Sequence, residues 1–145
     1  MAATMEPMAT RTKVETLTVR SRKRSDAIEV TERVASLVRE SGISEGLCEV
    51  FVPHTTAGIF INENADPDVL SDLLTTLDSL VPWEDARYRH TEGNAAAHIK
   101  STLVGVGLSI PVRSGELALG RWQGIFLAEF DGPRQREIQV TIVGQ

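Results

Sequence analysis

Three histidines, the only ones in this chain of 145 residues, are the side chains best suited to carry out chemistry. They are His54, His90 and His98, and each lies among polar or helix-opening residues rather than within an apolar run. Neutral imidazole is the commonest side-chain metal ligand, and its pKa lies nearest neutral pH. Three histidines around an open position are typical of a catalytic Zn²⁺, which acidifies a bound water. We therefore predict that the three histidines meet at one site.

The spacing of the histidines leaves two chemical interpretations open. The sequence contains none of the short patterns of familiar zinc sites, such as His-Glu-x-x-His, Cys-x-x-Cys or the zinc deaminase signature. A metal site would therefore be assembled from distant parts of the chain. The second interpretation is a histidine acid–base site that works without a metal.

Two glutamates near the histidines have no evident structural role. We assign Glu92 as a general base or as the partner that orients a metal-bound histidine, and Glu63 as a second candidate for the same task. Asn62 and Asn94, whose amides can both donate and accept hydrogen bonds, are assigned to orient the substrate.

The helix predicted over residues 95–103 offers a place for an anion as well as for His98. Asn94 is its predicted N-cap, and the first N–H groups of a helix favour phosphate. Lys100 lies about 200° around the helix from His98, so it faces away, toward solvent or a neighbouring subunit. Trp122 is interpreted as a core residue rather than an aromatic wall of the site. The predicted substrate contacts are Lys100, Arg121, Trp122, Gln123 and Thr55.

Composition narrows the class of partner. The net charge of −5 and the pI of about 5.2 argue against a broad nucleic-acid-binding face. No apolar run approaches the ~20 residues that cross a bilayer, and the N-terminus lacks the apolar segment of a secretory signal. Cys48 is the only cysteine, so no intramolecular disulfide can form. We expect a cytoplasmic protein that binds neither nucleic acid nor membranes.

Periodicity and turn residues predict a single mixed domain. Residues 1–11 are expected to be a disordered tail, and residues 12–145 to form the domain. Thr31 is the predicted N-cap of a first helix and Asp66 of a second. We predict an α+β fold, a compact domain of mainly antiparallel β-sheets packed as a sandwich with two to three helices. Predicted strands cover residues 14–19, 46–52, 58–62, 108–112, 116–119, 124–130 and 137–143.

A basic run in the first third of the chain is interpreted as a solvated turn. A phosphate-binding patch is the alternative, but the chain as a whole is acidic. The run consists of Arg20, Arg22, Lys23 and Arg24.

Six blocks of sequence, in order, resemble the YjbQ-like family, also called the secondary thiamine-phosphate synthase family. The resemblance spans roughly residues 12–143, and one departure is Arg121, where the family usually has Thr. The blocks are Pro53-His54-Thr55-Thr56-Ala57, Asn62-Glu63-Asn64-Ala65-Asp66-Pro67, His90 to Lys100, Ile110-Pro111-Val112, Leu119-Gly120-x-Trp122-Gln123 and Glu129-x-Asp131-Gly132-Pro133-Arg134.

The resemblance implies a compact α+β domain of packed antiparallel sheets that assembles as a homotrimer. It also implies that His54, His90 and His98 cluster around a divalent metal, most often zinc. The activity it implies is weak thiamine-phosphate synthesis, in which a pyrimidine methyl diphosphate joins a thiazole phosphate and pyrophosphate leaves. Mg²⁺ is a second possible ion if that diphosphate chemistry takes place.

The residues themselves offer only a modest apparatus for a departing diphosphate. Such a reaction needs cations around the leaving group, and the sequence has no Gly-rich phosphate loop. Our first hypothesis is a metal-dependent enzyme that acts on a small phosphorylated metabolite. A metal-assisted hydrolase of another substrate and a non-catalytic metal- or metabolite-binding trimer are the alternatives.

Overall fold

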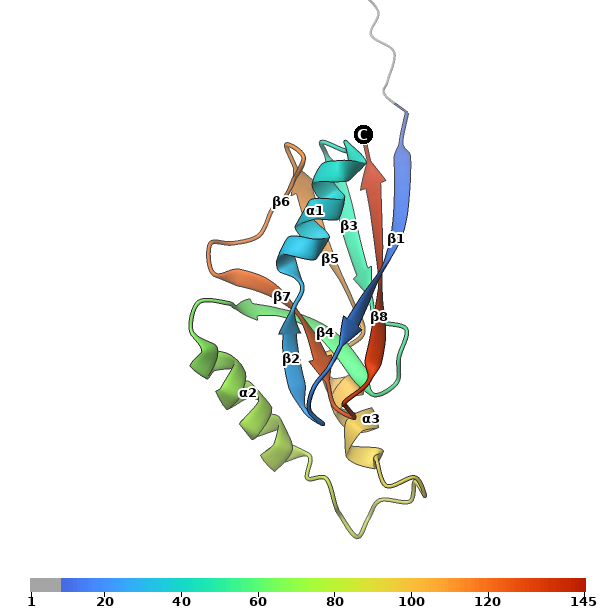
Figure 1. Cartoon of the computed structure of the whole chain (residues 1–145), viewed down its shortest axis with the longest axis vertical. Helices are drawn as coiled ribbons and strands as arrows, with labels where there is room; N and C mark the ends of the chain where they lie inside the picture. The colour runs from blue at the N-terminus through green and yellow to red at the C-terminus, as the bar shows by residue number, and fades with distance from the viewer. Residues whose placement is uncertain (1–8) are drawn as a thin grey trace, which may run out of the picture.

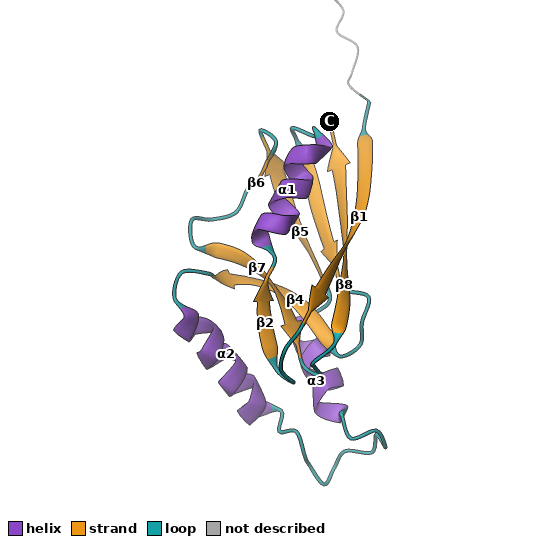
Figure 2. Cartoon of the chain, viewed as in Figure 1, coloured by secondary structure: helices purple, strands orange, loops and turns teal. Residues whose placement is uncertain are grey.

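The computed structural model describes residues 9–145 as two antiparallel sheets and three helices (Figures 1 and 2). The larger sheet has the strand order β1-β8-β3-β5-β6 and the smaller one the order β2-β7-β4. The predicted tail lies outside the described residues as far as residue 8, and the first strand begins at Arg11. The strands are β1 (Arg11–Arg20), β2 (Asp26–Glu29), β3 (Gly46–Phe51), β4 (Ala57–Glu63), β5 (Gly107–Arg113), β6 (Glu116–Leu117), β7 (Gln123–Glu129) and β8 (Gln135–Gly144). The helices are α1 (Thr31–Ser41), α2 (Pro67–Leu80) and α3 (Ala95–Val104).

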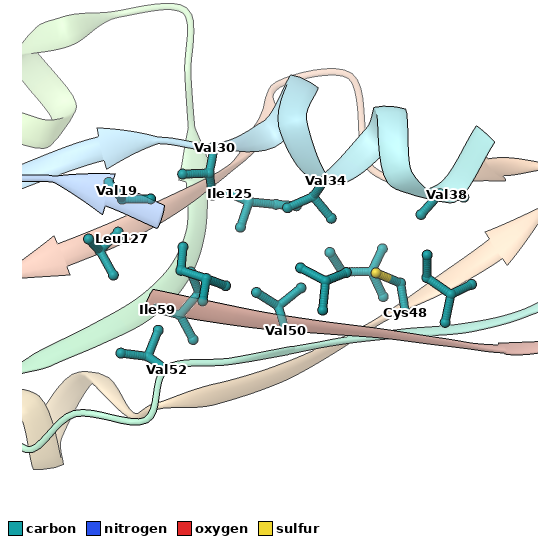
Figure 3. Packing of buried hydrophobic residues seen from close by; sticks show 14 of the residues in the cluster. Val19, Val30, Val34, Val38, Cys48, Val50, Val52, Ile59, Ile125 and Leu127 are labelled. Carbon is teal, nitrogen blue, oxygen red and sulfur yellow. The ribbon is translucent and has the colours of Figure 1, made fainter. Parts of the chain in front are cut away.

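The main core lies between the two sheets and is closed on one side by α1. Every second residue of β8 points inward, which is the pattern of a strand with one buried face. Val34 and Val38 of α1 lie over Cys48 and Val50 of β3 (Figure 3). The smaller sheet contributes Ile59, Ile125 and Leu127 to the same cluster. The predicted α+β sandwich is thus confirmed, with three helices.

A smaller cluster covers the outer face of the three-stranded sheet. Leu74 and Leu77 of α2 pack there against Phe130, although none of the residues of α2 is fully buried. The end of α3 approaches the sheet at Gly58, where an added Cβ would lie 2.6 Å from the carbonyl oxygen of Gly105. This close approach fixes the position of α3, and with it the position of His98.

The outer face of the five-stranded sheet carries exposed apolar side chains. Val14, Leu47, Phe51 and Val143 are all exposed there. Leu47 and Val143 are cross-strand neighbours, so this apolar surface is continuous across β3 and β8.

Local details confirm one predicted cap and correct another. The Asp66 side chain accepts the N–H of Asp68 at 2.9 Å, as expected for an N-cap. Thr31 is not a cap, because α1 begins after Val30 and the Thr31 hydroxyl accepts the N–H of Ile125 instead. Across residues 9–145, none of the helices has the length and apolar character needed to cross a membrane.

Candidate functional site

Two adjoining pockets lie between the β3–β4 loop, α3 and the β7–β8 turn, and they share His54, Thr55 and His98. The first, which we call the polar pocket, has a volume of about 360 Å³. The second, which we call the adjoining pocket, has a volume of about 520 Å³. The polar pocket is lined by Pro53, His54, Thr55, Thr56, Glu92, Asn94, His98, Asp131, Arg134 and Arg136. The adjoining pocket is lined by His54, Thr55, His98, Ser101, Thr102, Gly105 and Val106.

His54 is positioned by the point at which β3 leaves the larger sheet. The pairing of β3 with β8 ends at Phe51, opposite Gln139. Beyond it, the Nε2 atom of His54 accepts the N–H of Glu137 at 2.9 Å and replaces the missing strand partner. Because Nε2 accepts, a neutral His54 carries its proton on Nδ1. Burial, followed by the nearby Arg136 charge, lowers the pKa of His54, so the neutral form is favoured.

His98 and His90 form a pair next to this pocket. Their ring centroids are 5.0 Å apart in an edge-to-face arrangement. His98 is half-buried and lines both pockets, whereas His90 is exposed and has Glu92 as its neighbour, with 3.7 Å between Nε2 and Oε2. The structure thus brings His98 to the pockets together with His54. His90 contacts His98 but is not among the residues that line either pocket.

The arrangement within one chain does not fit a metal held by all three histidines. Within residues 9–145, no group of three His, Cys, Asp or Glu side chains is placed to hold an ion. His54 would first have to release the N–H of Glu137 before Nε2 could bind a metal. The metal site on His54, His90 and His98 therefore stays a prediction.

Arg136, which lines the polar pocket, belongs to a buried ion pair that the sequence analysis missed. Arg136 is 5% exposed and Glu129 is fully buried. The Nε and Nη2 atoms of Arg136 donate to the two carboxylate oxygens of Glu129 at 2.8 and 2.5 Å, and Nη2 also donates to the Thr56 hydroxyl at 2.8 Å. The remaining amino group, Nη1, has no hydrogen-bond partner within the part of the chain that the structure describes. A rigidly held guanidinium thus keeps one donor group for a ligand.

Glu129 stays ionised although it is buried. Burial alone would raise the pKa of Glu129, but hydrogen bonds from Arg136, from the Asp131 main chain and from Ser21 outweigh that effect and lower it. The carboxylate therefore fixes the Arg136 guanidinium across the neutral pH range.

Asn94 occupies the N-cap position of α3, but its side chain does not cap the helix. Its Nδ2 atom donates to Asp131 at 2.9 Å, and Asp131 also binds Arg134 at 3.1 Å. The Oδ1 atom of Asn94 is buried without a hydrogen-bond partner among the described residues. The first turn of α3 thus lacks a side-chain cap beside the pocket, and this is a favourable position for an anion.

Several predicted site residues lie elsewhere in the chain. Asn62 and Glu63 are at the far end of β4, roughly 20 Å from the pocket at 3.3 Å per residue. Gln123 pairs with Glu63 across the sheet, and Arg121 stacks on Trp122 at 4.9 Å near the same end. Within one chain these five residues do not share a site with the histidines.

Two individual interpretations are wrong. Trp122 is not a core residue, because 54% of its surface is exposed. Lys100 was expected to reach solvent or a neighbouring subunit, but its side chain is buried within the chain. It is 2% exposed, pairs with Asp78 of α2, and lies 5.9 Å from the centre of the Phe130 ring. Lys100 therefore joins two helices in this arrangement and does not reach the pockets.

Comparisons with known proteins agree with this fold. The model of the UPF0047 protein YjbQ-like family matches residues 15–145. The UPF0047 protein YugU of Bacillus subtilis is 47% identical over 131 residues, which cover 90% of this chain and 99% of that protein. A crystal structure of a YbjQ-like protein of unknown function from Sulfolobus solfataricus has a TM-score of 0.91 at 34% identity and covers 94% of this chain and all of that one. A crystal structure of a yjbq/upf0047 family protein from Clostridium acetobutylicum has a TM-score of 0.86 at 48% identity, with coverage of 88% and 98%. The chain belongs to the YjbQ-like, or UPF0047, protein family.

Proposed function

We propose that the protein is an enzyme that acts on a small phosphorylated metabolite bound in the polar pocket. The observation that carries this proposal is the free Nη1 group of Arg136 in a pocket that two histidines also line. A guanidinium that is already fixed by Glu129 loses little freedom when it donates to a phosphate. Arg134 and the uncapped start of α3 add further favourable contacts for an anion.

The two histidines at the junction of the pockets have distinct proposed tasks. His98 is the proposed acid–base group, because its ring is not fixed by the main-chain contact that holds His54. A neutral His54 can donate from Nδ1 to the bound ligand. Glu92 lines the same pocket and is the proposed partner that receives or returns the proton.

The adjoining pocket is the proposed place for the organic part of the substrate. Val106 and Gly105 line it together with the methyl-bearing side chain of Thr102. Two adjoining pockets suit a reaction of two small molecules, and the thiamine-phosphate synthase-like transfer implied by the family resemblance is the candidate. In that transfer, the thiazole ring nitrogen would bond to the pyrimidine methylene carbon as the C–O bond to the diphosphate breaks. Pyrophosphate would leave toward Arg136 and Arg134, and His98 would protonate it as it leaves.

We further propose that the domain assembles as a homotrimer, the assembly implied by the family resemblance. The exposed apolar side chains on the outer face of the five-stranded sheet, among them Leu47 and Phe51, support an interface there. Light scattering on the purified protein should give the mass of three chains. Leu47→Glu should reduce it to that of one chain, whereas Glu15→Gln, on the inward-facing register of β1, should not.

Turnover assays test the proposed reaction. The protein is incubated with the pyrimidine methyl diphosphate and the thiazole phosphate, and then with a panel of phosphate monoesters, and released pyrophosphate or phosphate is measured. We expect His98→Ala to reduce the rate by about 100-fold, the usual range for loss of an acid–base group. Lys13→Ala, remote from the pockets, is the control.

The other outcomes separate the alternatives. Binding of phosphorylated compounds without turnover would favour a binding protein and contradict the enzyme. Turnover that survives His98→Ala would remove the proposed acid–base group. Absence of any phosphate binding would overturn the site itself.

A further inference from the structure

A run of cations in the turn between β1 and β2 has no part in the proposed site. We call residues 20–24 the basic turn; it contains Arg20, Arg22, Lys23 and Arg24 in a chain of net charge −5. Within residues 9–145, none of these four side chains forms an ion pair. Arg20 donates to a side-chain amide oxygen of β8, and Arg24 stacks on Trp83 at 4.1 Å. Arg22 and Lys23 are exposed, and the nearby Asp26 carboxylate accepts the main-chain N–H of Arg22 at 3.2 Å without pairing with either side chain.

Ser21 connects the basic turn to the two arginines of the polar pocket. This residue is almost fully buried. Its hydroxyl donates to Glu129 Oε1 at 2.8 Å and accepts the main-chain N–H of Arg134 at 2.8 Å. Because Glu129 also holds Arg136, one hydroxyl links the turn to both pocket cations. The basic turn is therefore fixed in place relative to the phosphate-binding groups.

The basic turn also lies in direct contact with the β7–β8 turn, which forms one wall of the polar pocket (Figure 1). The N–H of Gly132 donates to the carbonyl oxygen of Arg24 at 3.0 Å. A Cβ on Gly132 would lie 2.2 Å from the carbonyl oxygen of Lys23, so only glycine allows this approach. The fold thus places a segment with four basic side chains against the wall of the pocket.

We propose that the basic turn is a second phosphate subsite, which binds a phosphate group of the substrate other than the one bound by Arg136. This inference rests on the proposed function, in which the first phosphate binds Arg136. The pocket arginines alone can bind one phosphate. In the free protein, the unpaired positive charges of the basic turn repel one another. A second phosphate, bound by Arg22 and Lys23 beside Arg134, neutralises them. The small extent of the basic surface and the acidic remainder of the chain favour a small molecule over a nucleic acid.

Calorimetry on the full chain tests the subsite with three probes: inorganic phosphate, pyrophosphate and tripolyphosphate. We expect the wild type to bind the longer anions more tightly than phosphate. In the double variant Arg22→Ala/Lys23→Ala, the affinity for pyrophosphate or tripolyphosphate should fall by about tenfold, whereas phosphate binding should change less than about twofold. The dependence of tripolyphosphate binding on salt should become less steep. Lys13→Ala/Arg113→Ala, which removes two cations at the other end of the five-stranded sheet from the basic turn, is the control.

Each remaining outcome has one meaning. An equal loss for all three probes in the double variant would show general attraction and overturn the subsite. Equal affinity of the wild type for phosphate and the longer anions would also overturn it, while leaving the proposed function intact. A wild type that binds none of the probes would overturn both proposals. Because Arg22 and Lys23 are exposed, folding of the double variant is verified by an unchanged circular dichroism spectrum.

Discussion

Two almost fully buried cations in this protein, Arg136 and Lys100, differ in the exposure of their partners. The partner of Arg136, Glu129, is fully buried between the sheets. The partner of Lys100, Asp78, is 56% exposed on α2. The first pair is almost fully buried and fixes a guanidinium at a pocket, whereas the second fastens one helix to another at the surface.

The difference shows which of the two cations serves a site. Arg136 is held through Nε and Nη2, whereas Nη1 has no hydrogen-bond partner among residues 9–145, and the residue lines the polar pocket. Lys100 lies between α2, which has no fully buried residue, and the ring of Phe130. Burial of a charge therefore does not by itself indicate function, because what matters is whether a donor remains free at a cavity.

The largest effect on stability is expected from breaking the buried pair of Arg136 and Glu129. Glu129→Gln leaves the Arg136 charge buried without a counter-charge, which should lower the free energy of unfolding by about 3–5 kcal/mol. Phosphate binding should weaken as well, because the guanidinium is no longer fixed. Urea unfolding and calorimetry with phosphate measure the two effects. A loss of less than about 1 kcal/mol would show that the pair is not desolvated as the structure indicates.

Acid should weaken the same pair. Since the pKa of Glu129 is lowered in the folded protein, its contribution is fully present above the unfolded pKa of a glutamate, about 4.3. That contribution is lost as the pH falls through the lower, folded pKa. Unfolding free energies measured from pH 7 down to pH 3 should therefore decline more steeply in the wild type than in Glu129→Gln. Parallel curves would contradict the assignment.

The sequence predicted the sandwich because alternation in strands such as β8 is a local property of the chain. It missed β2, since its four residues, Asp26–Glu29, are too few to show a period. It also missed Arg136, although a signal was present. Arg136 lies on the same alternate positions as Ile138 and Val140, so a charge on the buried face of β8 required a buried partner.

The candidate site was predicted in part for a related reason. Loops at one end of the sandwich carry His54 and Glu92, and the structure does place both at the polar pocket. Asn62 and Glu63 are the last two residues of β4, the strand that follows the loop of His54, so they lie at its opposite end. A single sequence shows that polar residues flank a strand, and it does not show which end of the strand faces the site.

A smaller effect on stability is expected from removing the pair of Lys100 and Asp78, whose aspartate is exposed. Lys100→Met keeps most of the side-chain volume and leaves Asp78 in contact with water, so the free energy of unfolding should change by less than about 1.5 kcal/mol in either direction. Urea unfolding measures it beside Glu129→Gln. A loss as large as that of Glu129→Gln would remove the contrast between the two pairs and would make α2 as strongly bound as the sheets.

The smallest change in stability is expected on metal removal. A metal held by His54, His90 and His98 must compete with the bond between His54 Nε2 and the Glu137 N–H, so the loss of that bond offsets part of the free energy of metal binding. If the metal prediction is correct, elemental analysis should find about one divalent ion per chain, as expected for a three-histidine site. The ion should be lost in His98→Ala, and chelation from a solution whose free ion is at most about four times the dissociation constant should lower the free energy of unfolding by less than about 1 kcal/mol. Metal-free protein that still binds phosphate would end the metal prediction and leave Arg136 as the centre of the site, because the guanidinium contact needs no ion.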